Sequence, residues 1–261
     1  MAERNKIYFE IILLLYSAFL TTTFISCKNK ITAQAEDNAK FIASNGLIST
    51  GKFVSPKNPS KLTFIMLHGL GSSKEEWFTF ADKLAAKGYG YFAYDLRGHN
   101  ESIKDKAGNI ISYKSFFNIG PDSEWELMIR DLDYAIKYLR RKGIKKENIG
   151  IMGASLGANI ALIYASKHEF IKKIVLLSPG LQYAGLYTAN AMKNYNNRKI
   201  LIAASPKDQY PYESSVYLAD IAKKQKDDIE FLSESGSKYG VHGVQMFDGK
   251  FDNKIIDWVE K

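Results

Sequence analysis

The chain has 261 residues, of which 46% are hydrophobic and 25% charged, with a formal net charge of +8. This composition excludes a low-complexity or repetitive chain and is typical of one globular domain with a substantial core. The positive charge lies in short clusters that are typical of solvated helix ends. We therefore expect no nucleic-acid partner, and an anionic membrane surface is the better alternative.

The first 27 residues resemble an export signal, because a short charged start precedes an apolar stretch, Ile11 to Leu20, and small polar residues. The only cysteine, Cys27, follows "FIS" in an arrangement similar to the lipobox of bacterial lipoproteins, with Phe24 where leucine is usual. We predict that residues 1–27 form a signal and lipid-anchor segment with Cys27 as the lipidation site, in a bacterial cell envelope. An uncleaved N-terminal anchor and an incidental cysteine are the alternatives.

The polar residues 28–38 predict a tether, and residues 39–261 predict the folded domain. Asn45-Gly46 lies between two apolar runs, which is a strong signal for a β-hairpin. Further apolar runs are typical of strands buried on both faces, at 61–69, 90–99, 148–155, 171–180, 199–208 and 228–235. Apolar residues at helical spacing predict helices at 75–89, 123–143, 156–168, 212–226 and 252–261.

After the hairpin, strands alternate with helices along the chain. This order predicts an α/β fold with a mostly parallel, twisted sheet of about eight strands, an N-terminal antiparallel hairpin and helices on both faces. In such folds, ligands bind outside the carboxyl ends of the strands. Reactive side chains at those ends are therefore the candidates for function.

Ser155 lies in the stretch "MGASLGA", between a predicted strand and a predicted helix. Glycines at 153 and 157 remove side chains where strand and helix approach each other, so the turn can be sharp and the hydroxyl can project above the sheet. The serine is therefore a candidate nucleophile. Taken alone, its placement fits a helix-capping serine equally well.

A serine hydroxyl needs a base to accept its proton and a third group to orient that base. His242 lies in a loop after the last predicted strand, and Asp208 ends the strand before that one. Ser155, Asp208 and His242 thus all fall at carboxyl ends of strands, which predicts a catalytic triad. Asp95, at the end of an earlier strand, is the alternative acid.

From about Ala39 to the C-terminus, the chain resembles the α/β-hydrolases. Besides the serine turn and the chain order of the triad, the segments that carry the resemblance are "SNGLISTGKFVSP", "IMLHGLGSSKEEW", "YDLRGHNES", "ASPKDQYPY" and "GVHG". Asn100 stands where the family usually has glycine. The resemblance implies an α/β-hydrolase fold.

The resemblance also implies a role for each residue of the site. Ser155 would attack the substrate carbonyl, His242 would carry the proton, and Asp208 would orient the imidazole. The backbone N–H groups of Leu70 and Leu156 would stabilise the oxyanion. His68, Asp95 and His99 are expected to shape the loops rather than to react.

The substrate pocket is less well specified. Only residues 181–198 separate two predicted strands where many relatives carry a lid, which leaves room for one short helix and excludes a large cap domain. Residues 101–122 are the better candidate for a pocket wall, with Tyr113, Phe116 and Phe117 either lining an acyl site or packing against the sheet.

The function expected from these features is hydrolysis of a small carboxylic ester or thioester, without cofactor or metal. The chain resembles uncapped serine esterases and dienelactone-hydrolase-like relatives. A serine peptidase or amidase of the same fold is the first alternative, and a non-catalytic binding lipoprotein is the second. The sequence carries no signal for an oligomeric state.

Overall fold

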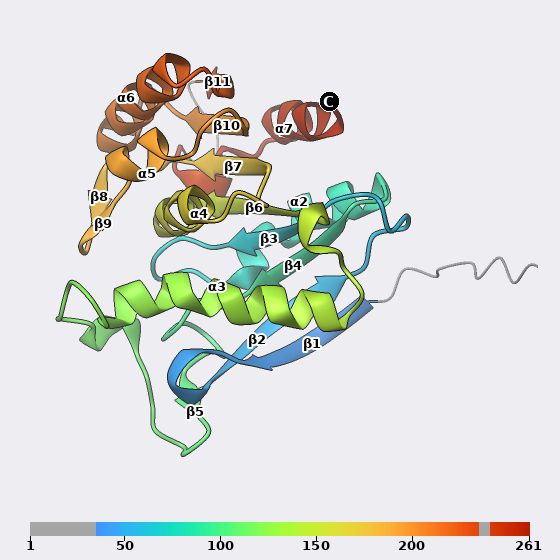
Figure 1. Ribbon diagram of the computed structural model, residues 1–261, viewed down its shortest axis with the longest axis vertical. Coiled ribbons are helices and arrows are strands. Elements are labelled where there is room, and N and C mark those ends of the chain that lie inside the picture. Colours follow the sequence, from blue (N-terminus) through green and yellow to red (C-terminus); the bar gives the residue numbers. More distant parts are fainter. Residues whose placement is uncertain (1–34, 235–240) are drawn as a thin grey trace, which may run out of the picture. The chain divides into compact units, whose positions relative to one another are not determined.

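The computed structural model describes residues 35–234 and 241–261 (Figure 1). Its strands are β1 (Ala35–Ile42), β2 (Leu47–Val54), β3 (Thr63–Leu67), β4 (Gly90–Tyr94), β5 (Lys104–Asp105), β6 (Ile149–Ala154), β7 (Lys173–Leu177), β8 (Gln182–Tyr183), β9 (Leu186–Tyr187), β10 (Lys199–Ala204) and β11 (Asp228–Ser233). Its α-helices are α2 (Phe78–Ala86), α3 (Glu124–Arg141), α4 (Leu156–Lys167), α5 (Ala189–Lys193), α6 (Gln209–Lys224) and α7 (Phe251–Glu260).

The main sheet has the order β1-β2-β4-β3-β6-β7-β10-β11, and β5 adds to β2 outside this path. The pairs that involve β2 are antiparallel, and every pair from β4 to β11 is parallel. The predicted mostly parallel sheet with an N-terminal antiparallel hairpin is therefore confirmed.

The hairpin turns at Asn45 and Gly46, which both have positive φ, as the Asn-Gly signal predicts. Its first strand begins at Ala35, so the predicted tether is wrong for residues 35–38: Ala35 and Glu36 pair with β2, and the register shifts before Ala39. The rest of the tether and the predicted signal segment with Cys27 lie outside the described residues. Within the part of the chain that the structure describes, no helix is long and apolar enough to cross a membrane.

Each central strand is buried on both faces because alternate side chains enter two separate cores. In β3, for example, Ile65 and Leu67 belong to the core that also contains residues of α3, α4, α5 and α6, whereas Phe64 and Met66 belong to the core that contains residues of α2 and α7. Figure 1 shows these helices on both sides of the sheet. The continuous apolar runs thus follow from helices on both faces, as predicted.

The connection between β7 and β10 is short. It holds the two-stranded β8–β9 hairpin, which the sequence did not reveal, and the five-residue helix α5, which lies in the predicted helical stretch. Within the described residues, no cap domain is inserted there.

Arg97 ties the loop after β4 to two other parts of the fold. Its side chain is buried and donates to both carboxylate oxygens of Asp131 on α3, at 3.0 and 2.9 Å, and to the carbonyl of Ser44 at the β1–β2 turn. Ser44 N–H also donates to Asp131. A buried ion pair whose hydrogen bonds are satisfied becomes costly when one partner is removed.

We predict that Arg97→Met lowers the free energy of unfolding by about 3 to 5 kcal/mol, because it leaves the buried carboxylate of Asp131 without its cation. Urea unfolding measures the change. The matched control is Arg130→Met, which removes the exposed ion pair with Asp122 and is expected to cost about 1 kcal/mol or less. Equal losses in the two variants would contradict the prediction.

Candidate active site

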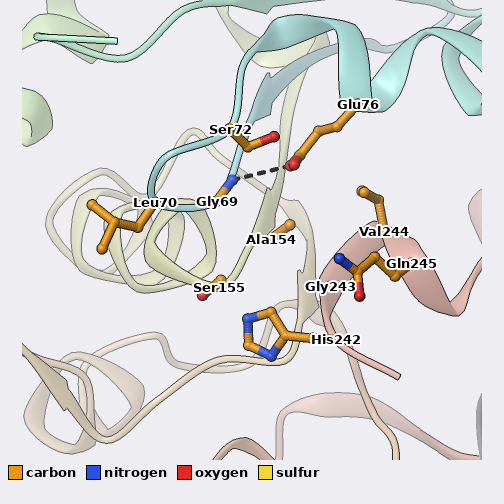
Figure 2. Close-up of a pocket in the computed structure, with 10 residues that line it drawn as sticks. All are labelled: Gly69, Leu70, Ser72, Glu76, Ala154, Ser155, His242, Gly243, Val244 and Gln245. Carbon is orange, nitrogen blue, oxygen red and sulfur yellow. Dashed lines mark hydrogen bonds between the residues drawn. The ribbon is translucent and has the colours of Figure 1, made fainter. Parts of the chain in front are cut away.

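The predicted nucleophile lies on a sharp turn between β6 and α4. Ser155 has φ of 53° and ψ of −117°, a backbone conformation that serine rarely adopts. Its N–H donates to the carbonyl of Leu177 at the end of β7, at 2.8 Å. The turn is thereby tied to the neighbouring strand, and Ser155 borders the cavity in Figure 2.

The glycines on either side of the turn are required by close backbone contacts. A Cβ atom at Gly153 would lie 2.2 Å from the carbonyl oxygen of Gly157. A Cβ atom at Gly157 would lie 2.2 Å from the carbonyl oxygen of Leu67 and 2.8 Å from that of His68. The start of α4 is therefore packed directly on the end of β3, as the sequence predicts for these two positions.

The structure brings the predicted base and acid together. His242 Nδ1 lies 2.6 Å from Asp208 Oδ2, and Asp208 occupies the N-cap position of α6, in the loop after β10. The described residues 241–250 carry His242 and are called the histidine loop. This loop is fixed to the sheet because Gly243 N–H donates to Ser178 Oγ at the end of β7. Asp208 and Gly243 thus lie at the same edge of the sheet as Ser155.

His242 and Ser155 line the same cavity, and the imidazole faces the serine in Figure 2. Between these two described side chains there is no hydrogen bond in the structure, whereas the hydrogen bond from His242 to Asp208 is formed. Such contacts are often long in an unliganded site and tighten when substrate binds.

The alternative acid, Asp95, is engaged elsewhere. Its carboxylate is buried and accepts hydrogen bonds from the backbone N–H and the ammonium group of Lys74, at 2.9 and 2.8 Å. Burial raises the pKa of Asp95, and Lys74 opposes that shift. Asp95 therefore fixes the loop after β3, and Asp208 is the acid that contacts the imidazole.

The predicted oxyanion donors lie on either side of Ser155. Leu70 belongs to the loop after β3 and lines the cavity. Leu156 is the first residue of α4, and the first helical hydrogen bond is the one from Ala158 N–H to the carbonyl of Ser155. The N–H groups of the preceding helical residues have no acceptor within the helix, so they present the positive end of its dipole near Ser155.

His68 shapes this loop, as predicted. The side chain is buried, its Nε2 accepts a hydrogen bond from Leu96 N–H, and its Nδ1 donates to the carbonyl of Gly69. Burial lowers the pKa of His68 to about 3, so the imidazole is neutral at physiological pH. A neutral imidazole with both nitrogens occupied is a structural link between the loops after β3 and β4.

None of the three predicted pocket residues lines the cavity at Ser155. Tyr113 stacks on His99 with ring centroids 4.1 Å apart, and Phe116 packs edge-on against Trp125. The side chain of Phe117 is 84% exposed. Of the two alternatives given for these rings, packing is therefore the one observed beside this cavity, because Tyr113 packs on His99 in the loop after β4, Phe116 packs on Trp125 of α3, and Phe117 is exposed.

The cavity at Ser155 has a volume of about 150 Å³ and lies between the loop after β3 and the histidine loop (Figure 2). Its lining comprises Gly69, Leu70, Ser72, Glu76, Ala154, Ser155, His242, Gly243, Val244 and Gln245. Sequence reasoning missed Glu76, although a serine three residues before a glutamate is a recognisable helix-start signal. Among the described residues, no cluster of histidine, cysteine and carboxylate side chains could hold a metal ion.

The model of a family described as the alpha/beta hydrolase fold matches residues 63–209. No curated protein matches the chain in sequence. Among solved structures, the chain is similar to the Pyrococcus furiosus esterase Pf2001, with a TM-score of 0.66, 17% identity, and 87% of this chain and 92% of that chain covered.

Two further solved structures with a similar fold are enzymes that are named for different reactions. A dienelactone hydrolase from Anabaena variabilis has a TM-score of 0.61 and 16% identity, with 87% of this chain and 97% of that chain covered. An acylaminoacyl peptidase from Pyrococcus horikoshii has a TM-score of 0.61 and 16% identity, with 88% of this chain but only 41% of that chain covered. At these identities the likeness establishes the fold and leaves the reaction open.

We predict that Gly157→Ala lowers the free energy of unfolding by about 3 kcal/mol or more, because the new methyl group overlaps the backbone at the end of β3. Denaturant unfolding tests this. The control is Gly108→Ala, where φ is +89° but no atom lies within 4 Å of the new Cβ, so backbone strain alone costs about 1 kcal/mol. Similar costs at the two sites would rule out the overlap.

We also predict that His68 stays neutral from pH 8 to pH 5 in the folded protein, because its folded pKa is about 3. The unfolded chain binds a proton at His68 as the pH falls below about 6.5. Protonation of His68 in the unfolded chain therefore lowers the free energy of unfolding by about 1.4 kcal/mol for each pH unit between about pH 6.5 and about pH 3. Nitrogen-15 NMR of the imidazoles, assigned with His68→Gln, measures the protonation of His68 in the folded protein. A titration midpoint near pH 6.5 would contradict the prediction.

Proposed function

We propose that this chain, which belongs to the alpha/beta hydrolase fold family, is a serine hydrolase of small carboxylic esters or thioesters. The observation that carries the proposal is the 2.6 Å contact between His242 Nδ1 and Asp208 Oδ2, beside a cavity that Ser155 also lines. This arrangement supplies a nucleophile, a base and an orienting acid from three separate strand ends.

In the proposed mechanism, Asp208 accepts a hydrogen bond from the Nδ1–H group of His242, so Nε2 of His242 is the basic nitrogen. His242 takes the proton from Ser155 Oγ as this oxygen attacks the carbonyl carbon, and it then donates the proton to the leaving alcohol. Water hydrolyses the acyl-enzyme by the same steps in reverse order. Asp208 stays ionised and stabilises the imidazolium.

The oxyanion of each tetrahedral intermediate would be bound by the N–H groups of Leu70 and Leu156. The positive end of the α4 dipole adds to this stabilisation, because the negative charge develops at the helix N-terminus. Each such donor typically contributes about 3 kcal/mol to the lowering of the barrier.

The size of the cavity supports a small substrate. Its volume of about 150 Å³ lies below the several hundred Å³ that is usual for drug-sized ligands, so we propose a short group on the part of the ester that enters it. The reaction needs no cofactor. We also propose, on the sequence alone, that Cys27 carries a lipid anchor in a bacterial cell envelope.

We predict that the purified protein hydrolyses p-nitrophenyl esters, with the highest kcat/KM for short acyl chains in a series from acetate to palmitate. Ser155→Ala is expected to lower kcat by about 10⁴- to 10⁶-fold, and Asp208→Asn by about 10⁴-fold, because the imidazole then loses its tautomer. A spectrophotometric assay of released p-nitrophenol measures both effects.

The matched control is Asp248→Asn, which changes an exposed carboxylate that caps the start of α7 and should leave kcat unchanged. A fluorophosphonate probe that labels the wild type but not Ser155→Ala would identify the nucleophile independently of substrate. Faster cleavage of anilides than of the matched esters would point to an amidase or peptidase instead. A folded protein that neither reacts with the probe nor cleaves either substrate would contradict the catalytic proposal.

A further inference from the structure

One carboxylate lies in the cavity without a role in the triad. Of the ten described residues that line the cavity, Glu76 is the only carboxylate, and none is a lysine or an arginine. It lies on the short 3₁₀ helix Lys74–Trp77, directly after the loop that carries Leu70. Figure 2 shows it across the cavity from Ser155, on the side that the histidine loop also borders.

Glu76 is held in place by the loop itself. Gly69 N–H donates to Glu76 Oε1 at 3.0 Å, and the nearby Ser72 hydroxyl lowers the pKa of the carboxyl group. The residue that follows, Trp77, is fully buried in the core between the sheet and α2. The carboxylate therefore has a fixed position, and its remaining lone pairs are available to a ligand.

The lysine on the same 3₁₀ helix does not pair with Glu76. Lys74 lies two residues away, but its ammonium group pairs with Glu75, Asp95 and Glu101, at 2.9, 2.8 and 2.7 Å, and not with Glu76 among these described residues. The negative charge of Glu76 therefore faces the cavity. Burial raises the pKa of Glu76, whereas the Ser72 and Gly69 hydrogen bonds and the nearby His242 lower it.

We propose that Glu76 determines the charge selectivity of the site, so that the group bound in the cavity carries an amine or quaternary ammonium cation. This proposal rests on the hydrolase function proposed for Ser155. A cation in the partly desolvated cavity is attracted to the carboxylate, and an anionic group is repelled by it. The class of substrate is then an ester with a cationic amino-acyl or amino-alcohol part.

The same side chain is a positioning residue for the oxyanion loop. Its contact with Gly69 N–H fixes the peptide one residue before Leu70, and it leaves Leu70 N–H available to the oxyanion. Two substitutions of Glu76 distinguish its effect on charge selectivity from its effect on the position of the oxyanion loop. Glutamine keeps an oxygen that accepts from Gly69 but loses the charge, whereas alanine loses both.

The test uses the full-length protein and two pairs of esters that match in shape but differ in one charge. Acetylcholine is compared with 3,3-dimethylbutyl acetate, and 4-trimethylammoniobutanoate is compared with 5,5-dimethylhexanoate as p-nitrophenyl esters. The wild type is expected to favour the cationic member of at least one pair. In Glu76→Gln the ratio of kcat/KM for the cationic ester to kcat/KM for its neutral partner falls at least tenfold.

Glu76→Ala is expected to lower kcat on the neutral ester as well, because Gly69 loses its acceptor, and Glu76→Gln is expected to restore it. The control is Glu75→Gln, which removes the same charge from the next residue but lies outside this cavity. It should leave the ratio unchanged. An equal ratio in wild type and Glu76→Gln, or an equal fall in Glu75→Gln, overturns the proposal.

The proposed function is judged separately, by hydrolysis of the neutral ester that is lost in Ser155→Ala. If no ester is cleaved, calorimetric binding of choline and of 3,3-dimethylbutanol decides the charge proposal. The charge proposal predicts that choline binds at least tenfold more weakly to Glu76→Gln than to the wild type, whereas the neutral alcohol binds equally well to both. Equal choline affinity in the two proteins would refute it.

Discussion

The site depends on a backbone contact between the start of α4 and the end of β3. Without side chains at Gly153 and Gly157, the helix descends onto the carbonyl groups of Leu67 and His68. That contact sets the distance between the serine turn and the loop that starts at Gly69. Both halves of the predicted oxyanion site are thus positioned by one steric constraint, before any hydrogen bond is considered.

Polar contacts then hold the loops in position above the sheet. His68 joins the loop after β3 to the loop after β4, Asp95 and Lys74 join the same loops further out, and Arg97 links the second loop to α3. All of these side chains are buried. A surface that must stay open for substrate cannot be closed by apolar packing, so hydrogen-bonded groups with fixed directions take that role.

The sequence predicts the fold well because continuous apolar strands and amphipathic helices are local patterns, and the parallel sheet follows from their order. Asp208 and His242 could be chosen as the acid and the base because the carboxyl ends of parallel strands meet at one edge of the sheet. Tyr113 and Phe116 could not be placed, because aromatic side chains suit a pocket wall and packing on a neighbouring element equally well, and their ring partners, His99 and Trp125, lie in other elements of the fold. The role proposed for Glu76 could not be predicted, because it depends on which carboxylates the ammonium group of Lys74 contacts in the folded structure.

The order of the site residues along the chain has a consequence for the newly made protein. The serine turn is complete once β6 and α4 have formed, but the imidazole reaches it only when the loop of Gly243 docks on Ser178, near the end of the chain. In the proposed triad, the hydroxyl therefore has no base until that loop has docked. A hydrolase that works by this triad is inactive during synthesis and gains activity only when folding is complete.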